Sequence, residues 1–339
     1  MIKNTEHKKI RVAIFGAGGI THKAYLPLLT TWSGIEIIGI FSRTQDSIDK
    51  VCSAFNLCNG TTDAQELIKM KPDAAFVLTN NQTHYKYVKM LLNAGIDVFV
   101  EKPITENSQD AQILAQIAEK EKRVLMVGFN RRYSLLYKQA KEIFSGQKIQ
   151  LAVFQKNRPQ ATHTSLYNNY LDDTIHQIDL LRFYCGKVEP LFTSYEEEEG
   201  KIVGAVSVCK LKDGGSGVII TSLKAGSWQE SAILQGENLT VEVDAFEKLT
   251  IKHPDHQQVF GTDRPGKWIP DMQERGFYGE IEHFFDCIVS RTQPQTNGVD
   301  AVKTLQLIEK LVEVAGLKPD QHPADNWDQI ARWDQNISS

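Results

Sequence analysis

The first 128 residues alternate between apolar runs and amphipathic stretches. The apolar runs are short and nearly continuous, as in strands covered on both faces of a parallel sheet, and they fall at residues 10–15, 35–41, 73–79, 97–100 and 124–128. The amphipathic stretches between them predict helices, for example at 84–95 and 108–122. Repeated strand–helix–strand units predict right-handed crossovers and a doubly wound parallel sheet of the Rossmann type.

The pattern changes after residue 128. Helical stretches come first, at 131–144 and 172–186, and alternating apolar and polar positions then predict antiparallel strands at 201–211, 216–226, 231–243 and 248–253. Two more helices are predicted at 280–290 and 301–316. The sequence therefore predicts an α/β protein of two domains. Residues 1–128 form a Rossmann domain, and residues 129–339 form an α+β domain with an open, mostly antiparallel sheet.

Composition narrows the class of partner. At 339 residues, with 41% hydrophobic and 24% charged residues, the chain is an ordinary globular protein long enough for two domains. Its 38 basic and 42 acidic residues leave a net charge of −4, so we expect no general attraction to nucleic acid or to an anionic membrane. The expected partner is a small-molecule substrate or another protein.

Cysteine usage and the N-terminus indicate the compartment. The five cysteines are scattered without a C-x-x-C pair, which favours reduced thiols over a disulfide framework or a zinc site. The basic N-terminus carries an apolar run of about six residues, too short for a signal peptide, and no window approaches the roughly 18 apolar residues of a membrane span. We therefore expect a cytoplasmic protein.

A glycine-rich turn follows the first predicted strand. Gly16, Gly18, Gly19 and Ile20 lead into the first helix, and Thr21 stands where the full dinucleotide fingerprint has its third glycine. The first glycine allows the tight turn, and the second lets backbone N–H groups approach a pyrophosphate at the positive end of the helix. Because the turn lies inside the first strand–helix–strand unit, we predict that these four residues bind a nicotinamide dinucleotide.

The end of the second strand indicates which dinucleotide. An NAD-type site has a carboxylate there to accept a hydrogen bond from the ribose 2′-OH, whereas this chain has Ser42 and Arg43. Glu36 lies at the start of the strand, away from the predicted crevice. Ser42 can donate to a 2′-phosphate, and Arg43 can pair with that phosphate or stack on the adenine, although Arg43 as a solvated loop cation is the alternative. We therefore predict NADP(H) rather than NAD(H).

Further polar residues follow the later strands of the same sheet. Thr79 and Asn80 come after one strand, and Glu101 and Lys102 after the next, so we expect all four in the cofactor crevice. Lys102 precedes Pro103, where a cis bond is compatible with a sharp turn, and its ammonium can stabilise an alkoxide or polarise a carbonyl. The alternative is a surface lysine before a turn. His84 has two open readings, a helix N-terminal residue near the cofactor and a buried structural histidine.

Asp172, His176 and Asp179 are spaced i, i+4 and i+7, which predicts one face of a helix. This set can be an acid/base pair, a metal site or an ordinary exposed face. We predict no metal, because Lys102 would share the cleft and no third clustered ligand is evident. For hydride transfer at a carbinol, His176 can accept or return the hydroxyl proton while Asp172 orients it or relays the proton. Asp179 is expected to serve the fold.

Five motifs in order resemble the Gfo/Idh/MocA family of oxidoreductases. They are the G-x-G-G-I turn, the segment 79–84, Glu101-Lys102-Pro103, the segment 128–132, and the D-x-x-x-H-x-x-D pattern at 172–179. The resemblance spans residues 10 to about 315, and 128–137, 273–277 and 294–296 are most similar to the MviM-type branch, which is associated with virulence factors and has no settled substrate. It implies that Lys102, Asp172 and His176 match the catalytic positions of inositol dehydrogenase-like members.

Two departures from the family pattern concern the substrate. Tyr167-Asn168-Asn169-Tyr170 stands where many members have glycines, and Thr174 stands where many have glycine between the aspartate and the histidine. Specificity therefore cannot be carried over. Arg132 and Lys156 are predicted to bind substrate, with pairing to acidic residues as the alternative. His163, in a polar loop that could cover the pocket, is given no role.

The function predicted from the sequence is that of an NAD(P)-dependent dehydrogenase or reductase acting on CH–OH groups. Two alternatives remain: a nucleotide-binding regulatory or scaffold protein of the same fold without turnover, and a member that uses the cofactor for internal redox, as lyase or hydrolase relatives do. The open sheet of the second domain, as a flat exposed surface, predicts a homodimer or homotetramer.

Overall fold

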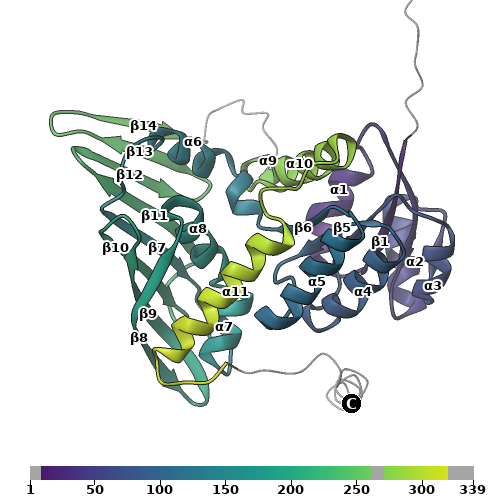
Figure 1. Cartoon of the computed structure of the whole chain (residues 1–339), viewed down its shortest axis with the longest axis horizontal. Coiled ribbons are helices and arrows are strands. Elements are labelled where there is room, and N and C mark those ends of the chain that lie inside the picture. The colour runs from purple at the N-terminus through teal and green to yellow at the C-terminus, as the bar shows by residue number, and fades with distance from the viewer. Residues whose placement is uncertain (1–8, 262–270, 320–339) are drawn as a thin grey trace, which may run out of the picture. The chain divides into compact units, whose positions relative to one another are not determined.

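The computed structural model describes residues 9–261 and 271–319 (Figure 1). The chain divides into two compact units. Of the described residues, 9–128 and 281–301 form the first unit, and 129–261, 271–280 and 302–319 form the second.

The first unit is built on a parallel sheet of six strands in the order β3-β2-β1-β4-β5-β6. The strands are β1 (Ile10–Phe15), β2 (Ile35–Phe41), β3 (Gly60–Thr61), β4 (Ala74–Val77), β5 (Asp97–Glu101) and β6 (Leu125–Gly128). The helical segments that alternate with them are η1 (Thr21–Tyr25), α1 (Leu26–Leu29), α2 (Gln45–Phe55), α3 (Ala64–Lys69), α4 (Asn81–Asn93) and α5 (Ser108–Lys120). This strand order, with its reversal between β1 and β4, confirms the predicted doubly wound sheet.

The core of the first unit includes a segment from late in the chain. Phe284, in α10 (Phe277–Ser290), packs edge-on against Phe76 and Phe99 with ring centroids 5.4 and 5.7 Å apart. Arg291 donates to the buried Asp97 carboxylate at 2.6 Å. Residues 281–301, which the sequence analysis assigned to the second domain, therefore contribute to the core of the first unit.

The second unit is built on a sheet of eight strands in the order β14-β13-β12-β11-β7-β10-β9-β8, in which only β7 and β10 pair in parallel. The strands are β7 (Leu151–Asn157), β8 (Val188–Glu198), β9 (Lys201–Leu211), β10 (Ser216–Ser222), β11 (Gln229–Gly236), β12 (Leu239–Asp244), β13 (Lys248–Lys252) and β14 (Gln257–Gly261). The predicted mostly antiparallel sheet is confirmed, with β7, β8 and β14 in addition to the strands that the sequence indicated.

Helices cover one face of this sheet. Those that pack against it are α6 (Leu135–Ile143), α7 (Leu166–Asp172) and α8 (Ile175–Cys185). The other helical segments of this unit are η2 (Asn130–Tyr133), α9 (Asp271–Glu274) and most of α11 (Gly298–Glu313). The close fit is visible at Gly217 of β10, where a Cβ atom would lie 2.7 Å from a methyl carbon of Leu181 in α8. The central strands alternate buried positions under the helices with partly exposed positions on the other face.

Candidate functional site

The glycine turn after β1 has two kinds of glycine. Gly16 has a φ of +112°, and a Cβ atom there would lie 2.5 Å from the Leu78 carbonyl oxygen, so the fold itself requires glycine. At Gly18 and Gly19 a Cβ atom would meet nothing within 4 Å. Neither backbone strain nor packing within the protein explains these two glycines. An open cradle without side chains is what a bound pyrophosphate needs, so these residues fit the predicted dinucleotide.

Thr21, which stands at the position of the third glycine, fixes the turn. Its hydroxyl is fully buried and donates to the Gly16 carbonyl oxygen at 3.0 Å, which ties the turn to the start of the helix. The helix opens with the π-helical segment η1 rather than with a regular α-turn. The departure from the glycine fingerprint therefore has a local structural reason and leaves the cradle at Gly18 and Gly19 open.

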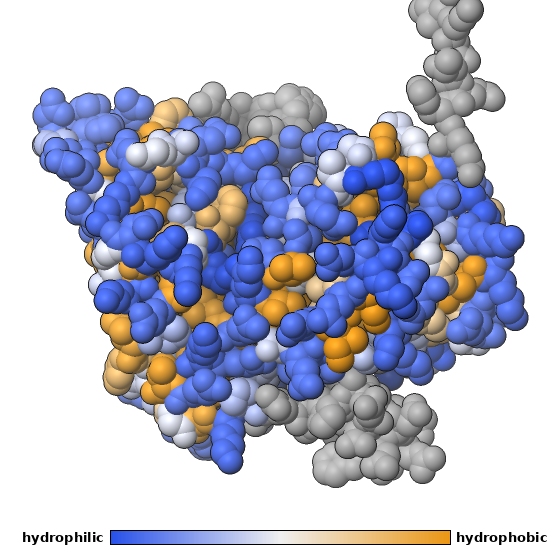
Figure 2. All heavy atoms as spheres, in the orientation of Figure 1, coloured by the Kyte–Doolittle hydropathy of each residue, from blue (hydrophilic) through white to orange (hydrophobic). Residues whose placement is uncertain are grey.

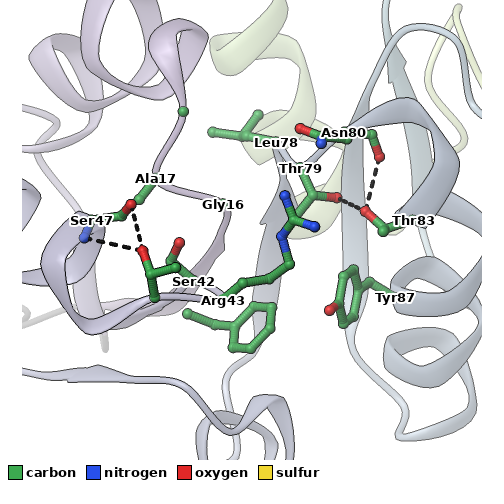
Figure 3. A pocket seen from close by; sticks show the side chains of 13 residues that line it. Gly16, Ala17, Ser42, Arg43, Ser47, Leu78, Thr79, Asn80, Thr83 and Tyr87 are labelled. Carbon is green, nitrogen blue, oxygen red and sulfur yellow. Dashed lines mark hydrogen bonds between the residues drawn. The ribbon is translucent and has the colours of Figure 1, made fainter. Parts of the chain in front are cut away.

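The turn forms one wall of a cavity of about 190 Å³ (Figure 3). The ends of β2 and β4 and the start of α4 supply the other walls. Six of the residues predicted to bind the cofactor line it: Gly16, Gly18, Ser42, Arg43, Thr79 and Asn80. The sequence analysis missed the remaining lining residues, which are Ala17, Phe41, Thr44, Ser47, Leu78, Thr83 and Tyr87. Gly19, Ile20, His84, Glu101 and Lys102 lie outside this lining.

The β2 side of the cavity carries hydroxyl groups and one guanidinium. Thr44 caps α2: its Oγ1 atom accepts from the Ser47 backbone N–H at 3.3 Å and donates to Ser47 Oγ at 2.8 Å. Figure 3 shows the Arg43 side chain extending across the cavity toward the α4 side. There burial raises the pKa of the Tyr87 hydroxyl, and the nearby positive charge of Arg43 partly offsets that rise. Among the described residues that line the cavity, none is acidic.

His84 is a structural link. Its imidazole is fully buried, with Nδ1 2.7 Å from the Pro103 carbonyl oxygen and Nε2 3.0 Å from the Thr79 carbonyl oxygen. It therefore joins the end of β4 to the turn after β5. Burial lowers its pKa from 6.5 to about 4, against the opposing effect of the two carbonyl contacts. Of the two readings left open by the sequence, the buried structural histidine is the one that this geometry supports.

The depressed pKa of His84 predicts a dependence of stability on pH. Between the unfolded value of 6.5 and the folded value of about 4, the unfolded chain binds a proton that the folded chain does not. The free energy of unfolding therefore has its full value above pH 6.5. As the pH falls toward 4, protonation of His84 in the unfolded chain lowers it by on the order of 3 kcal/mol. Urea unfolding across this range should show the loss, and His84→Gln should flatten it.

The exposed His253 provides the matched control for this measurement. His253→Gln should leave the slope of unfolding free energy against pH as in the wild type. A wild-type slope retained in His84→Gln would contradict the assignment.

Glu101 and Lys102 lie where β5 ends. The buried Tyr25 hydroxyl donates to Glu101 Oε1 at 2.6 Å, and the Lys102 backbone N–H donates to Glu101 Oε2 at 2.9 Å. The Lys102–Pro103 peptide bond is cis. Tyr25 closes η1, the segment that follows the glycine turn, so one side chain connects the turn to the loop that carries Lys102.

In the second unit, Asp172 and His176 lie on either side of a helix break. Asp172 ends α7 and His176 is the second residue of α8, because the Thr174 N–H bonds the Asn169 carbonyl oxygen five residues back at 3.0 Å and so makes a local bulge. The Asp172 side chain is 54% exposed, whereas His176 is 7% exposed. The continuous helical face predicted from the i, i+4, i+7 spacing is therefore interrupted.

Arg132 and Lys156 are bound within the second unit. Arg132 forms two hydrogen bonds to the buried Asp179, at 2.7 and 2.5 Å, and the Thr304 hydroxyl donates to the same carboxylate at 3.0 Å. Lys156 donates to the Asp173 carbonyl oxygen at 3.0 Å and lies 3.8 Å from Glu230. Both cations are buried and pair with carboxylates, the alternative that the sequence left open, so we assign neither of them to the substrate.

A buried ionic network holds the α7–α8 break to the sheet. Burial alone would raise the pKa of Asp173, but the hydrogen bonds and charges of Arg158 and Lys156 outweigh it and lower that pKa. For Glu230, burial is likewise outweighed by Arg131, which donates to it at 2.7 and 2.9 Å, and the pKa is lowered. Both carboxylates are thus held ionised at neutral pH.

The three predicted catalytic residues belong to different units: Lys102 to the first, and Asp172 and His176 to the second. Within residues 9–261 and 271–319, no cluster of three or more His, Cys, Asp or Glu side chains is placed to hold a metal ion. In the same part of the chain, no helix has the length and apolar character needed to cross a membrane.

Comparison with known proteins identifies the family. A model described as an oxidoreductase family with an NAD-binding Rossmann fold matches residues 10–129. Oxidoreductase YceM of Salmonella typhimurium is 31% identical over 90% of this chain and 97% of its own length. Myo-inositol 2-dehydrogenase of Thermotoga maritima is 26% identical over 88% and 94%. The crystal structure of the dehydrogenase MviM from Clostridium difficile matches with a TM-score of 0.83 at 26% identity, over 90% of this chain and 99% of that one.

These matches confirm the resemblance that the motifs predicted, including its MviM-type branch, and the chain belongs to the Gfo/Idh/MocA family of oxidoreductases.

Proposed function

We propose that this oxidoreductase is an NADP(H)-dependent dehydrogenase or reductase that acts on CH–OH groups. Its reaction is hydride transfer between the nicotinamide and a secondary alcohol or ketone of a sugar, polyol or similar small molecule. The observation that carries the proposal is the cavity of the first unit, lined by a glycine cradle on one wall and by Ser42 and Arg43 on another. The similarity to a myo-inositol 2-dehydrogenase supports a polyol or sugar as the substrate.

The β2 side of the cavity supports NADP(H) over NAD(H). A guanidinium and hydroxyl groups are the donors that pair well with a phosphate, and Arg43, Ser42, Thr44 and Ser47 supply them at one rim. An NAD-type site would have a carboxylate at the end of β2 for the ribose 2′-OH. Glu36 is exposed at the other end of that strand and is not among the lining residues.

We assign each step of the reaction to particular residues of the chain. The bound dinucleotide supplies or accepts the hydride. The Lys102 ammonium stabilises negative charge on the substrate oxygen, whether as a developing alkoxide or as a polarised carbonyl. His176 accepts the hydroxyl proton during oxidation and returns it during reduction, and Asp172 orients that exchange.

Nucleotide titration combined with a substrate panel tests the proposal. We expect NADPH to bind more tightly than NADH by fluorescence, and absorbance to report turnover on at least one polyol or sugar. Tight binding without turnover on any compound would favour the regulatory or scaffold alternative. Product formation without net change in NADP(H) would favour internal redox. Failure to bind either nucleotide would contradict the proposed cofactor dependence and with it the whole proposal.

The uncovered face of the second unit's sheet supports a homodimer or homotetramer. Five apolar residues form one row across five strands in the registered order Ile233, Val153, Val218, Val208 and Phe192. All five are at least partly exposed, and Phe192 is 55% exposed. In Figure 2, apolar residues also gather at the lower left, over the part of the second unit where Figure 1 labels β8 and β9. An apolar row on a flat sheet is a typical interface between subunits.

Phe192→Asp should break this assembly, because a carboxylate within an apolar interface loses its hydration without a partner. We expect light scattering to give a multiple of 38.2 kDa for the wild type and the monomer mass for the variant. Val289→Asp is the control, since Val289 is 76% exposed in the first unit. A wild-type mass of one chain would rule out the assembly.

A further inference from the structure

His163 contacts one of the residues to which we assign the chemistry. It lies in the loop between β7 and α7, and its Nε2 atom is 3.2 Å from Asp172 Oδ2. The imidazole side chain is only 14% exposed, whereas that of Asp172 is 54% exposed. The ring therefore supports the carboxylate from the protein side and leaves much of it accessible.

The contacts of His163 favour one tautomer of its imidazole ring, with the hydrogen on Nε2. A carboxylate only accepts hydrogen bonds, so Nε2 must carry the hydrogen that points to Asp172. The second nitrogen, Nδ1, lies 3.4 Å from the Thr162 hydroxyl, which can donate to it. The backbone is fixed as well, because the His163 carbonyl oxygen accepts from the Ile202 N–H of β9 at 2.9 Å.

The Arg158 guanidinium competes with His163 for the Asp172 carboxylate. Arg158, directly after β7, donates hydrogen bonds to Asp173, and these bonds raise the pKa of Arg158. The negative charge of Asp172 raises the same pKa. The Asp172 carboxylate is therefore attracted to this guanidinium. Asp173 itself is held by Arg158 and Lys156, which fixes the backbone beside Asp172, and the contact with His163 acts on the orientation of the Asp172 side chain.

We propose that His163 is a positioning residue for the reaction, holding the Asp172 carboxylate in one orientation by an Nε2–H hydrogen bond. The inference rests on the proposed function, in which Asp172 works beside His176. His163 touches neither substrate nor cofactor in this role. It acts through Asp172, so its removal should lower kcat and leave nucleotide binding unchanged.

NMR of the full-length protein tests the contact without any substrate. The imidazole N–H of His163 should give a downfield proton resonance protected from solvent exchange, assigned by its absence in His163→Phe. Asp172→Ala should abolish it or shift it strongly upfield, because the acceptor is gone. A resonance that is unaffected by Asp172→Ala, or absent from the wild type, would overturn the proposal.

Kinetics on a substrate found in the panel then tests the role. His163→Phe keeps the ring volume and removes the donor. We expect it to lower kcat by about 10- to 100-fold, the range seen when the partners that orient metal-ligating side chains are removed, with the NADPH Kd unchanged. His163→Gln keeps an N–H donor and should restore most of the rate. His163→Phe combined with Asp172→Asn should be no slower than Asp172→Asn alone, because the two residues act as one unit.

A second histidine–aspartate contact provides the matched control. His256 Nδ1 lies 2.8 Å from Asp255 Oδ1 in the exposed β13–β14 hairpin, and His256→Phe should leave kcat unchanged. Full activity in His163→Phe would overturn the inference and leave the proposed function standing. A wild type without turnover would overturn the proposed function instead, and the NMR result would still decide whether His163 holds Asp172.

Discussion

Lys102→Met should lower kcat by about 10²- to 10³-fold, the range seen when a charge that stabilises a substrate oxyanion is removed. Methionine keeps the unbranched apolar stem and removes the ammonium. The loop itself should remain in place, because Glu101 is held by Tyr25 and Pro103 is held by His84. We therefore expect the loss in kcat with a wild-type Tm and with a change in the NADPH Kd of less than about threefold.

Single-turnover absorbance measurements distinguish this loss from slow product release. Lys69→Met, at the end of α3 in the same unit, controls for the loss of one positive charge and should behave as the wild type. An unchanged kcat in Lys102→Met would refute the assigned role. A fall in nucleotide affinity of the same size as the fall in rate would instead make Lys102 a binding residue.

The buried strands of the first unit could be predicted, whereas the exposed edge strands β3, β8 and β14 and the central strand β7 could not. β1, β2, β4, β5 and β6 are buried, so their apolar runs are unmistakable. β3 has two residues, β14 is exposed throughout, and β8 mixes Pro190 with an acidic run on an edge that buries little. A hydrophobic pattern reports burial, so a strand that hydrogen bonds without burying side chains leaves little trace in the sequence.

The candidate site also contains residues that the sequence could predict and contacts that it could not. Gly16, Ser42 and Arg43 follow directly from the rule that ligands bind at the carboxyl ends of parallel strands, and they line the cavity. Helical spacing could not reveal the bulge at Thr174, since one shifted hydrogen bond rotates everything after it. Nor could it reveal the contact of His163 with Asp172, because loop geometry, not periodicity, brings them together.

Arg43→Ala should raise the NADPH Kd by about 10- to 100-fold, because hydrogen bonds to a charged group are worth about 1.5–3 kcal/mol. The NADH Kd should change by less than about threefold, because NADH has no 2′-phosphate for the guanidinium to contact. Fluorescence titration of both nucleotides measures the two constants on one sample. Lys50→Ala, on the exposed face of α2, is the matched control, since it removes a positive charge from the same region without touching the cavity.

Ser42→Asp tests the same rim in the opposite sense. A carboxylate at the end of β2 repels a 2′-phosphate and accepts a hydrogen bond from a 2′-OH, so it should weaken NADPH binding and strengthen NADH binding. Combined with Arg43→Ala, it should reverse the preference between the two nucleotides. If Arg43→Ala weakens both nucleotides equally, the guanidinium contacts the adenine or the pyrophosphate rather than a 2′-phosphate. An NADPH Kd unchanged in both variants would show that the β2 rim does not select the cofactor.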